Sequence, residues 1–185
     1  MGPQQPGYTA DEALTRETFL ALMWAFSYPG RVHALPEANP YQAIADTLLD
    51  LETSYFSPDD SLAFYLARTG ARALTPDRAA YHFYPTLDET LLEVVETAAV
   101  GTMLFPEEAA TLIVGARFGE GLTFRLQGPG LPPATPRLIR IAGVPRAFWQ
   151  VRANANQYPL GWDIYLVNGM QVIGIPRTTD MSLVE

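Results

Sequence analysis

The chain has 185 residues, of which 48% are hydrophobic and 17% are charged. These values are typical of one globular domain, and we expect residues 1–185 to fold as a single domain. The formal net charge of −8 disfavours nucleic acid as a partner, because binding to a phosphate backbone depends on clustered basic groups.

Three residue counts exclude several kinds of chemistry. The chain has no cysteine, which excludes disulfides, a catalytic thiol and a thiolate-bound cluster. All twelve basic residues are arginine, so neither a P-loop lysine nor a Schiff-base lysine for pyridoxal phosphate is present. With two histidines, a three-histidine zinc site is impossible. We therefore expect no bound cofactor and no bound metal on this chain.

The sequence also lacks the usual signals for a membrane or for export. No run approaches the roughly 20 apolar residues that a membrane-spanning helix requires. Residues 1–18 contain no apolar core of the kind found in signal peptides. We therefore expect a cytoplasmic protein that does not bind a membrane.

The first helix is signalled at both ends. The segment Thr9-Ala10-Asp11-Glu12 has the pattern of a capping box, and apolar side chains then recur at helical spacing until Tyr28-Pro29-Gly30 stops the helix. A short strand is expected over residues 31–35, and a second helix over residues 41–51.

A third helix is expected after the strand-like segment TSYFS (residues 53–57). Ser57 can cap this helix, Pro58 suits its first position, and the negative charge of Asp59 favours its positive end. Gly70 can adopt the left-handed conformation that ends a helix.

The middle of the chain alternates in the same way. A strand over residues 81–84 is followed by a second capping-box pattern, Thr86-Leu87-Asp88-Glu89, and a helix. The runs ATLIVGA and LTFRLQG are interpreted as two strands joined by a hairpin at residues 117–121. The next expected elements are a proline-rich loop, a strand and a helix, over residues 128–136, 138–141 and 145–155.

The segment YPLGWDIYLVNGMQVIGIPRTT (residues 158–179) predicts a β-hairpin. If Asn168-Gly169 forms a two-residue turn, Val167 lies opposite Met170 and Trp162 lies opposite Ile175. Both faces of this hairpin are apolar, so both must be covered. Together with the alternation of strands and helices, this pattern predicts an α/β fold with a mixed β-sheet covered by helices on both faces.

Asp163 is an acidic residue within this apolar hairpin, and the expected register places it opposite Gly174. A carboxylate in such a strand is costly unless it is paired or accepts several hydrogen bonds. Asp163 is therefore either a catalytic acid or a structural carboxylate that backbone amides or an arginine satisfy.

The hairpin ends in Pro176-Arg177-Thr178-Thr179. Proline cannot donate to a strand ladder, so it releases the residues that follow from the sheet. A guanidinium beside two hydroxyls suits a phosphate or a carboxylate, which makes Arg177, Thr178 and Thr179 candidate anion-binding residues. The alternatives are that Arg177 pairs with Asp163 or contacts a partner protein.

The remaining charged residues and histidines are weaker candidates for a functional site. Adjacent carboxylates point in different directions on most backbones, so Glu107 and Glu108 are expected in a solvated loop. His33 and His82 are expected to be packed or surface histidines. A scatter of arginines is expected on a solvated face: Arg137, Arg140, Arg146 and Arg152.

Three segments of the chain resemble one known family. In sequence order they are FLALMWAFSYPGRVHALP, FPEEAATLIVGARFGEGLTFRLQGPGL and YPLGWDIYLVNGMQVIGIPRTT. Together they are similar to the PhnH family, the H subunit of the bacterial carbon–phosphorus lyase core complex. Between Ala38 and Leu104 the likeness is only in the pattern of helices and strands. The most specific pieces are Pro29-Gly30, Arg125-Leu126 with Gly128 and Gly130, Pro159-Leu160-Gly161 with Asp163, and Pro176-Arg177-Thr178-Thr179.

This resemblance implies a subunit of a complex that acts in organic phosphonate catabolism. The complex forms α-D-ribose 1-methylphosphonate 5-triphosphate from ATP and methylphosphonate, which is a transferase step; a different subunit later breaks the carbon–phosphorus bond. For the H subunit, the resemblance implies a fold similar to the large domain of pyridoxal-phosphate-dependent transferases without that cofactor. It also implies a homodimer that assembles with the G, I and J subunits. ATP is then a substrate of the complex, and the resemblance assigns no catalytic residue to this chain.

Two classes of function stay open at this point. The first is a structural or accessory subunit of the transferase complex. The second is a free-standing phosphate- or phosphonate-binding protein or enzyme, which would use Arg177, Thr178, Thr179 and Asp163 on an anionic substrate.

Overall fold

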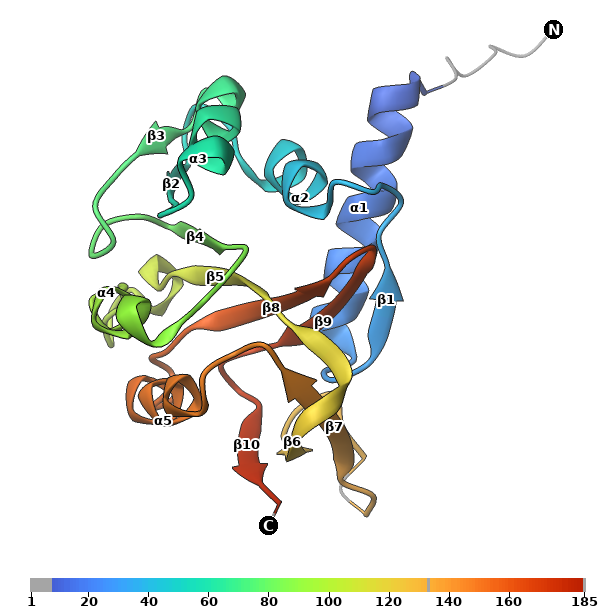
Figure 1. The fold of residues 1–185 in the computed structure, drawn as a ribbon, viewed down its shortest axis with the longest axis vertical. Coiled ribbons are helices and arrows are strands. Elements are labelled where there is room, and N and C mark those ends of the chain that lie inside the picture. Colours follow the sequence, from blue (N-terminus) through green and yellow to red (C-terminus); the bar gives the residue numbers. More distant parts are fainter. Residues whose placement is uncertain (1–7, 133, 185) are drawn as a thin grey trace, which may run out of the picture.

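The computed structural model describes residues 8–132 and 134–184. A seven-stranded sheet with strand order β1-β9-β8-β5-β4-β2-β3 forms its centre (Figure 1). Strands β8, β5, β4, β2 and β3 run parallel, whereas β9 is antiparallel to β8, and β1 to β9, so the predicted mixed sheet is confirmed. The strands are β1 (Val32–Ala34), β2 (Ser54–Phe56), β3 (Arg72–Ala73), β4 (Tyr81–Tyr84), β5 (Thr111–Gly115), β8 (Asp163–Asn168) and β9 (Gln171–Ile175).

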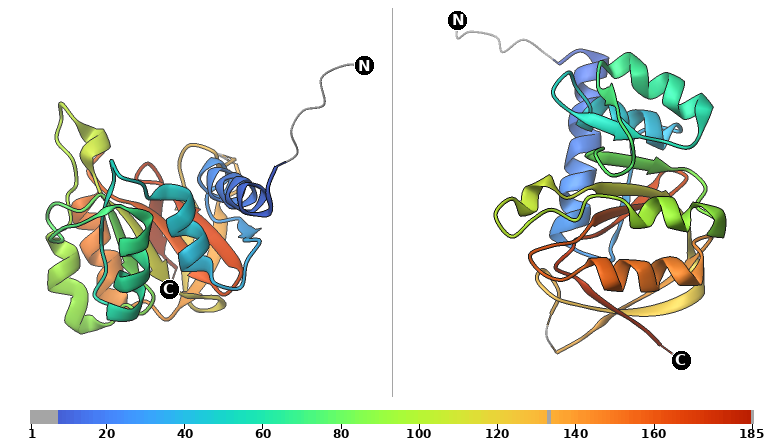
Figure 2. Two further views of the ribbon diagram at one scale, coloured as in Figure 1. Left: turned by 90° about the horizontal axis from the view of Figure 1, so that it is seen from above. Right: turned by 90° about the vertical axis from the view of Figure 1, so that its left-hand side faces the viewer.

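Helices cover both faces of this sheet, as the two apolar faces of the last hairpin predicted (Figures 1 and 2). Helices α1 and α2 lie on one face, and α4 and α5 lie on the other. The helices are α1 (Ala10–Ser27), α2 (Pro40–Leu48), α3 (Asp60–Leu66), α4 (Leu92–Glu96) and α5 (Arg146–Ala155), with 3₁₀ turns η1 (Ala67–Thr69), η2 (Glu89–Leu91) and η3 (Pro106–Glu108). Within the described residues, no helix is both long and apolar enough to cross a membrane.

Each face of the sheet has its own apolar core, because successive residues of a strand point to opposite faces. In β8, Ile164 and Leu166 face α5, whereas Tyr165 and Val167 face α1 and α2. Tyr165 stacks on the ring of Phe26 in α1, with the ring centroids 4.0 Å apart. The alternation explains why the strand is apolar at every position from Ile164 to Val167.

A second sheet of three strands packs against the same face of the first sheet as α5. Its order is β10-β6-β7, and all neighbours are antiparallel. The predicted hairpin at residues 117–121 is wrong, because the chain leaves the first sheet after β5 and residues 117–121 begin a strand of the second. The runs ATLIVGA and LTFRLQG do form strands, but a local sequence pattern does not indicate which sheet a strand joins. The strands are β6 (Arg117–Gln127), β7 (Arg137–Ala142) and β10 (Asp180–Leu183).

The last hairpin has a different register from the one predicted. Asn168 lies opposite Gln171, so the loop consists of Gly169 and Met170 rather than Asn168 and Gly169. The shift is two residues, which keeps every paired side chain on its predicted face. Its consequence is that Tyr165, not Asp163, lies opposite Gly174. Gly174 is needed because a Cβ atom there would lie 2.5 Å from the backbone of Ala25 in α1.

Two helix-boundary signals of the sequence are confirmed, one before α1 and one after α3 and η1. The capping box of α1 is confirmed: the Thr9 hydroxyl accepts from the backbone N–H of Glu12 at 3.2 Å, and the Glu12 carboxylate accepts from the N–H of Thr9 at 2.8 Å. Gly70 is confirmed as a left-handed stop, with φ of 87°.

At two other helix starts an aspartate replaces the cap that was expected. Asp59, not Ser57, caps α3 by accepting from a backbone N–H at 2.8 Å. Asp88, not Thr86, caps η2 in the same way at 2.9 Å. In both segments the aspartate lies closer to the first unpaired N–H groups, and its charge favours the positive end of the helix.

His82 in β4 is fully buried between Tyr84 and the carbonyl of Ala79, which lie 3.0 and 3.2 Å from its ring nitrogens. Burial lowers the pKa of His82 from 6.5 to about 4. Between these two pH values the unfolded chain binds a proton that the folded chain does not, so the free energy of unfolding falls as the pH falls.

We predict that His82→Gln reduces the loss of unfolding free energy between pH 7 and pH 4 by about 3 kcal/mol, because each pKa unit corresponds to about 1.4 kcal/mol. Urea unfolding at a series of pH values measures this loss. His33→Gln is the control, since His33 is only partly buried and should change the pH dependence less. An unchanged pH dependence in His82→Gln would contradict the prediction.

Candidate functional site

Arg177 follows the end of β9 and meets Asp163 at the start of β8. The backbone N–H of Arg177 donates to Oδ1 of Asp163 at 2.8 Å, and Nε and Nη2 donate to Oδ2 at 3.1 and 2.6 Å. The two side chains are only 15% and 23% exposed. The structure therefore places Arg177 in an ion pair with Asp163, which is one of the alternatives that the sequence left open.

The third guanidinium nitrogen of Arg177 binds a more distant segment. Nη1 donates to the carbonyl oxygen of Pro106, in the turn η3 that precedes β5. Each of the three guanidinium nitrogens thus has an acceptor within the chain. These bonds use three of the five guanidinium N–H groups, and the side chain is only 15% exposed. A phosphate would therefore have to compete with Asp163 and the Pro106 carbonyl for this guanidinium.

Arg152 of α5 lies beneath the exit of the hairpin. Its Nη2 donates to the carbonyl oxygens of Pro176 and Thr179, both at 3.1 Å. Its side chain is buried, and this burial lowers its pKa to about 10, partly offset by the negative charges of Asp163 and Asp180. The prediction of a solvated face is therefore wrong for Arg152, because the residues after β9 fold over α5.

Asn156, immediately after α5, joins the same group. Its side-chain oxygen accepts from the backbone N–H of Trp162 at 3.0 Å, and its amide donates to the carbonyl of Arg177 at 3.4 Å. We refer to Arg152, Asn156, Asp163 and Arg177 as the hairpin clamp. This group joins α5, the start of β8, the exit of β9 and the turn before β5.

The two threonines of the candidate motif do not complete a solvent-facing site with Arg177. Thr179 is buried, its backbone N–H donates to the carbonyl of Pro176 at 2.9 Å, and its hydroxyl has no partner among the described residues. Thr178 is half-buried, and its carbonyl lies against Gly128. The arrangement can therefore hold chain segments together, but it does not present the two hydroxyls beside a free guanidinium.

Comparison with known proteins identifies the family. The family model for PhnH, described as a bacterial phosphonate metabolism protein, matches residues 6–182. The chain belongs to the PhnH family. HtxG of Stutzerimonas stutzeri, whose name gives it provisionally as a C–P lyase subunit, is 33% identical over 187 aligned residues. That alignment covers 98% of this chain and 93% of HtxG.

The segments that carry the PhnH resemblance meet one another through close backbone contacts. The N–H of Gly30 donates to the carbonyl of Gly174 at 3.2 Å, which ties the end of α1 to β9. At Gly128, where φ is 137°, a Cβ atom would lie 2.6 Å from the carbonyl oxygen of Thr178. These two glycines of the PhnH pattern therefore have a structural role: each allows close backbone contact with a segment that is distant in the sequence.

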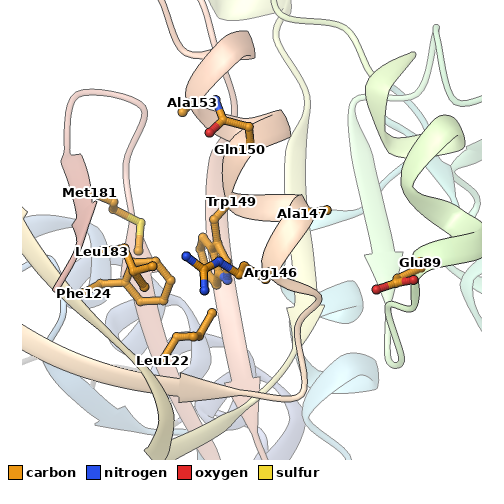
Figure 3. Close-up of a pocket in the computed structure, with 10 residues that line it drawn as sticks. All are labelled: Glu89, Leu122, Phe124, Arg146, Ala147, Trp149, Gln150, Ala153, Met181 and Leu183. Atoms are coloured by element: carbon orange, nitrogen blue, oxygen red, sulfur yellow. The ribbon is translucent and has the colours of Figure 1, made fainter. Parts of the chain in front are cut away.

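A groove of about 650 Å³ lies between α5 and the second sheet (Figure 3). Its walls are largely apolar, with Phe124 and Leu183 on the sheet side and Trp149 on the helix. The indole N–H of Trp149 has no partner among the described residues. Sequence reasoning did not predict this groove, because its walls come from segments far apart in the chain: Glu89, Leu122, Phe124, Arg146, Ala147, Trp149, Gln150, Ala153, Met181 and Leu183.

The other sequence candidates stay separate from the hairpin clamp. Glu107 and Glu108 are exposed, as expected, although they lie in the turn η3 rather than in an irregular loop. His82 is enclosed in the sheet, and His33 lies on the edge strand β1. Over residues 8–132 and 134–184, no group of three or more histidine or acidic side chains is placed to hold a metal ion.

We predict that Asp163→Ala and Arg177→Ala each lower the free energy of unfolding by about 3 kcal/mol, because each leaves a largely buried charge without its partner. The double variant should lose less than the sum of the two, with a coupling energy above about 1 kcal/mol. Chemical denaturation of the four proteins measures both quantities.

The exposed ion pair between Arg117 and Glu120 is the matched control, since its side chains are 65% and 56% exposed. Its coupling energy should stay below about 1 kcal/mol. Equal coupling in the two pairs would contradict a stabilising role for the hairpin clamp.

Proposed function

We propose that this chain is a subunit of the carbon–phosphorus lyase core complex. In this role it contributes to formation of α-D-ribose 1-methylphosphonate 5-triphosphate from ATP and methylphosphonate, as a structural or accessory subunit rather than a catalytic one. The observation that carries the proposal is membership of the PhnH family over residues 6–182, together with the near-full-length similarity to HtxG.

The geometry of the hairpin clamp supports the accessory role. A general acid must be able to exchange its proton with a substrate, but Asp163 is occupied by the backbone and guanidinium of Arg177. The guanidinium of Arg177 is occupied in turn by Asp163 and Pro106. The second functional class, a free-standing anion-binding protein or enzyme, needs these groups to be free, so the geometry speaks against it.

We extend the proposal to the location, the partner subunits and the fold similarity of the chain. We infer that residues 1–185 act as one PhnH-like unit in the cytoplasm, in contact with the G, I and J subunits. We also infer that the fold is similar to the large domain of pyridoxal-phosphate-dependent transferases without the cofactor. The parallel run of strands from β8 to β3 and the absence of lysine support this inference.

We further propose that two copies of the chain associate through α1. The outward side of the second half of this helix is apolar, with Phe19, Met23 and Trp24 exposed, although a surface helix usually directs polar residues outward. Glu17 lies toward one end of this apolar surface and Arg31 lies just beyond the other, and both are exposed. Two such helices packed antiparallel would bring the glutamate of one copy toward the arginine of the other.

The complex is tested by co-expression with the G, I and J subunits, followed by affinity purification through a tag on one of those subunits. We expect this chain to co-purify in a fixed ratio to the other subunits through size-exclusion chromatography. Recovery of a G, I and J assembly that lacks this chain would contradict the proposed function.

The homodimer is tested by light scattering of the isolated chain at micromolar concentration. We expect the mass of two chains for the parent and of one chain for Trp24→Glu, because a charge at the centre of an apolar interface is costly to bury. Phe64→Glu, at an exposed position on α3, is the control and should remain dimeric. A parent mass of one chain, or a dimeric Trp24→Glu, would contradict the assignment.

A further inference from the structure

A loop between α4 and η3 exposes three consecutive large apolar side chains. Met103, Leu104 and Phe105 are 71%, 83% and 51% exposed. We call these three residues the apolar tip. The segment that contains them projects from the body of the molecule, on the opposite side from α1 (Figure 2). Single exposed apolar residues are ordinary, whereas a run of three is unfavourable in water and signals a contact surface.

The apolar tip is held by hydrogen bonds within its own loop. The N–H of Thr102 donates to the carbonyl of Phe105 at 3.1 Å, and the N–H of Phe105 donates to the Thr102 hydroxyl at 3.0 Å. Gly101, before them, has a φ of 78° that favours glycine. These contacts fix a tight turn with the three side chains at its outer end.

The body of the protein holds the loop at both of its ends. The carbonyl of Val100 accepts from the N–H of Gly161 at 3.0 Å, and the carbonyl of Ala99 accepts from the N–H of Ala110 at 2.8 Å. On the far side of the apolar tip, the Pro106 carbonyl accepts from the guanidinium of Arg177. The hairpin clamp therefore orders the base of this loop, which reduces the entropy lost when the apolar tip binds.

We propose that the apolar tip is an anchor that inserts into an apolar pocket on a partner subunit of the complex, and that basic side chains surround this pocket. The inference rests on the proposed function. The basic surround follows from Glu107 and Glu108, which are exposed directly after the apolar tip and favour positive charge on the facing surface. Large apolar side chains in a fixed loop are typical of interface residues that carry much of the binding energy.

A protein partner fits these charges better than a lipid surface does. A cytoplasmic membrane surface is negative, so two glutamates beside the apolar tip would repel it, and so would the net charge of −8. A second copy of the chain is assigned to α1, which lies on the opposite side of the molecule (Figures 1 and 2). The apolar tip therefore remains accessible to a different subunit when two copies associate.

The test uses Leu104→Ser with Phe105→Ser in the full chain, co-expressed with the G, I and J subunits. The fraction that co-purifies should fall about tenfold or more relative to the parent, because truncating an anchor side chain commonly has an effect of this size. Phe64→Ser with Leu51→Ser is the matched control, with two apolar residues as exposed as the apolar tip but far from it in the chain. The control should assemble like the parent.

Two further measurements separate the possible results. Circular dichroism and thermal unfolding should match those of the parent, since the replaced side chains are largely exposed. Equal co-purification of the variant and the parent would overturn the anchor and leave the proposed function standing. Failure of the parent itself to assemble would overturn both. If light scattering shows that the variant of the apolar tip loses its dimer, the occupant is a second copy and the assignment to a different subunit is wrong.

Discussion

The ion pair between Arg177 and Asp163 is the interaction on which one end of the large sheet depends. Alone, a carboxylate at the start of a buried strand or a guanidinium at the end of its neighbour would be costly to remove from water. Together they compensate each other, and the remaining guanidinium nitrogen reaches the turn before β5. One side chain thus fixes three segments that are far apart in the sequence. Arg152 completes the arrangement by donating to carbonyls that have left the strand ladder.

The chemistry of arginine explains why Arg177, which the sequence suggested as an anion-binding residue, instead binds groups within its own chain. A guanidinium has donors in a fixed plane, so it can bind a carboxylate on one side and a backbone carbonyl on another, which the point charge of a lysine does less well. The chemistry that makes Arg177 attractive for phosphate is the same chemistry that the fold uses to hold itself together. Residue type alone therefore could not distinguish a substrate site from a structural one.

Because the charged groups of the hairpin clamp are used inside the fold, we expect the chain to contribute to an assembly mainly through its outer surfaces. Two apolar surfaces stand out, one on α1 and one at the apolar tip, and they lie on opposite sides of the molecule (Figure 1). That separation would let one chain contact two neighbours at once without competition between them. The hairpin clamp connects internal chemistry to this external role, because Arg177 orders the base of the loop that carries the apolar tip.

The sequence by itself determined the alternation of strands and helices, the covering of the large sheet on both faces, the cap of α1 and the existence of the last hairpin. These follow from local patterns of period two or 3.6 and from turn residues. Only the tertiary structure decided the register of that hairpin, since a shift of two residues leaves each side chain on the same face. It also decided that residues 117–121 join a second sheet, that Arg152 is buried and that each guanidinium nitrogen of Arg177 has an acceptor within the chain. Each of these depends on which distant segment packs against a residue, and a local pattern carries no information about that.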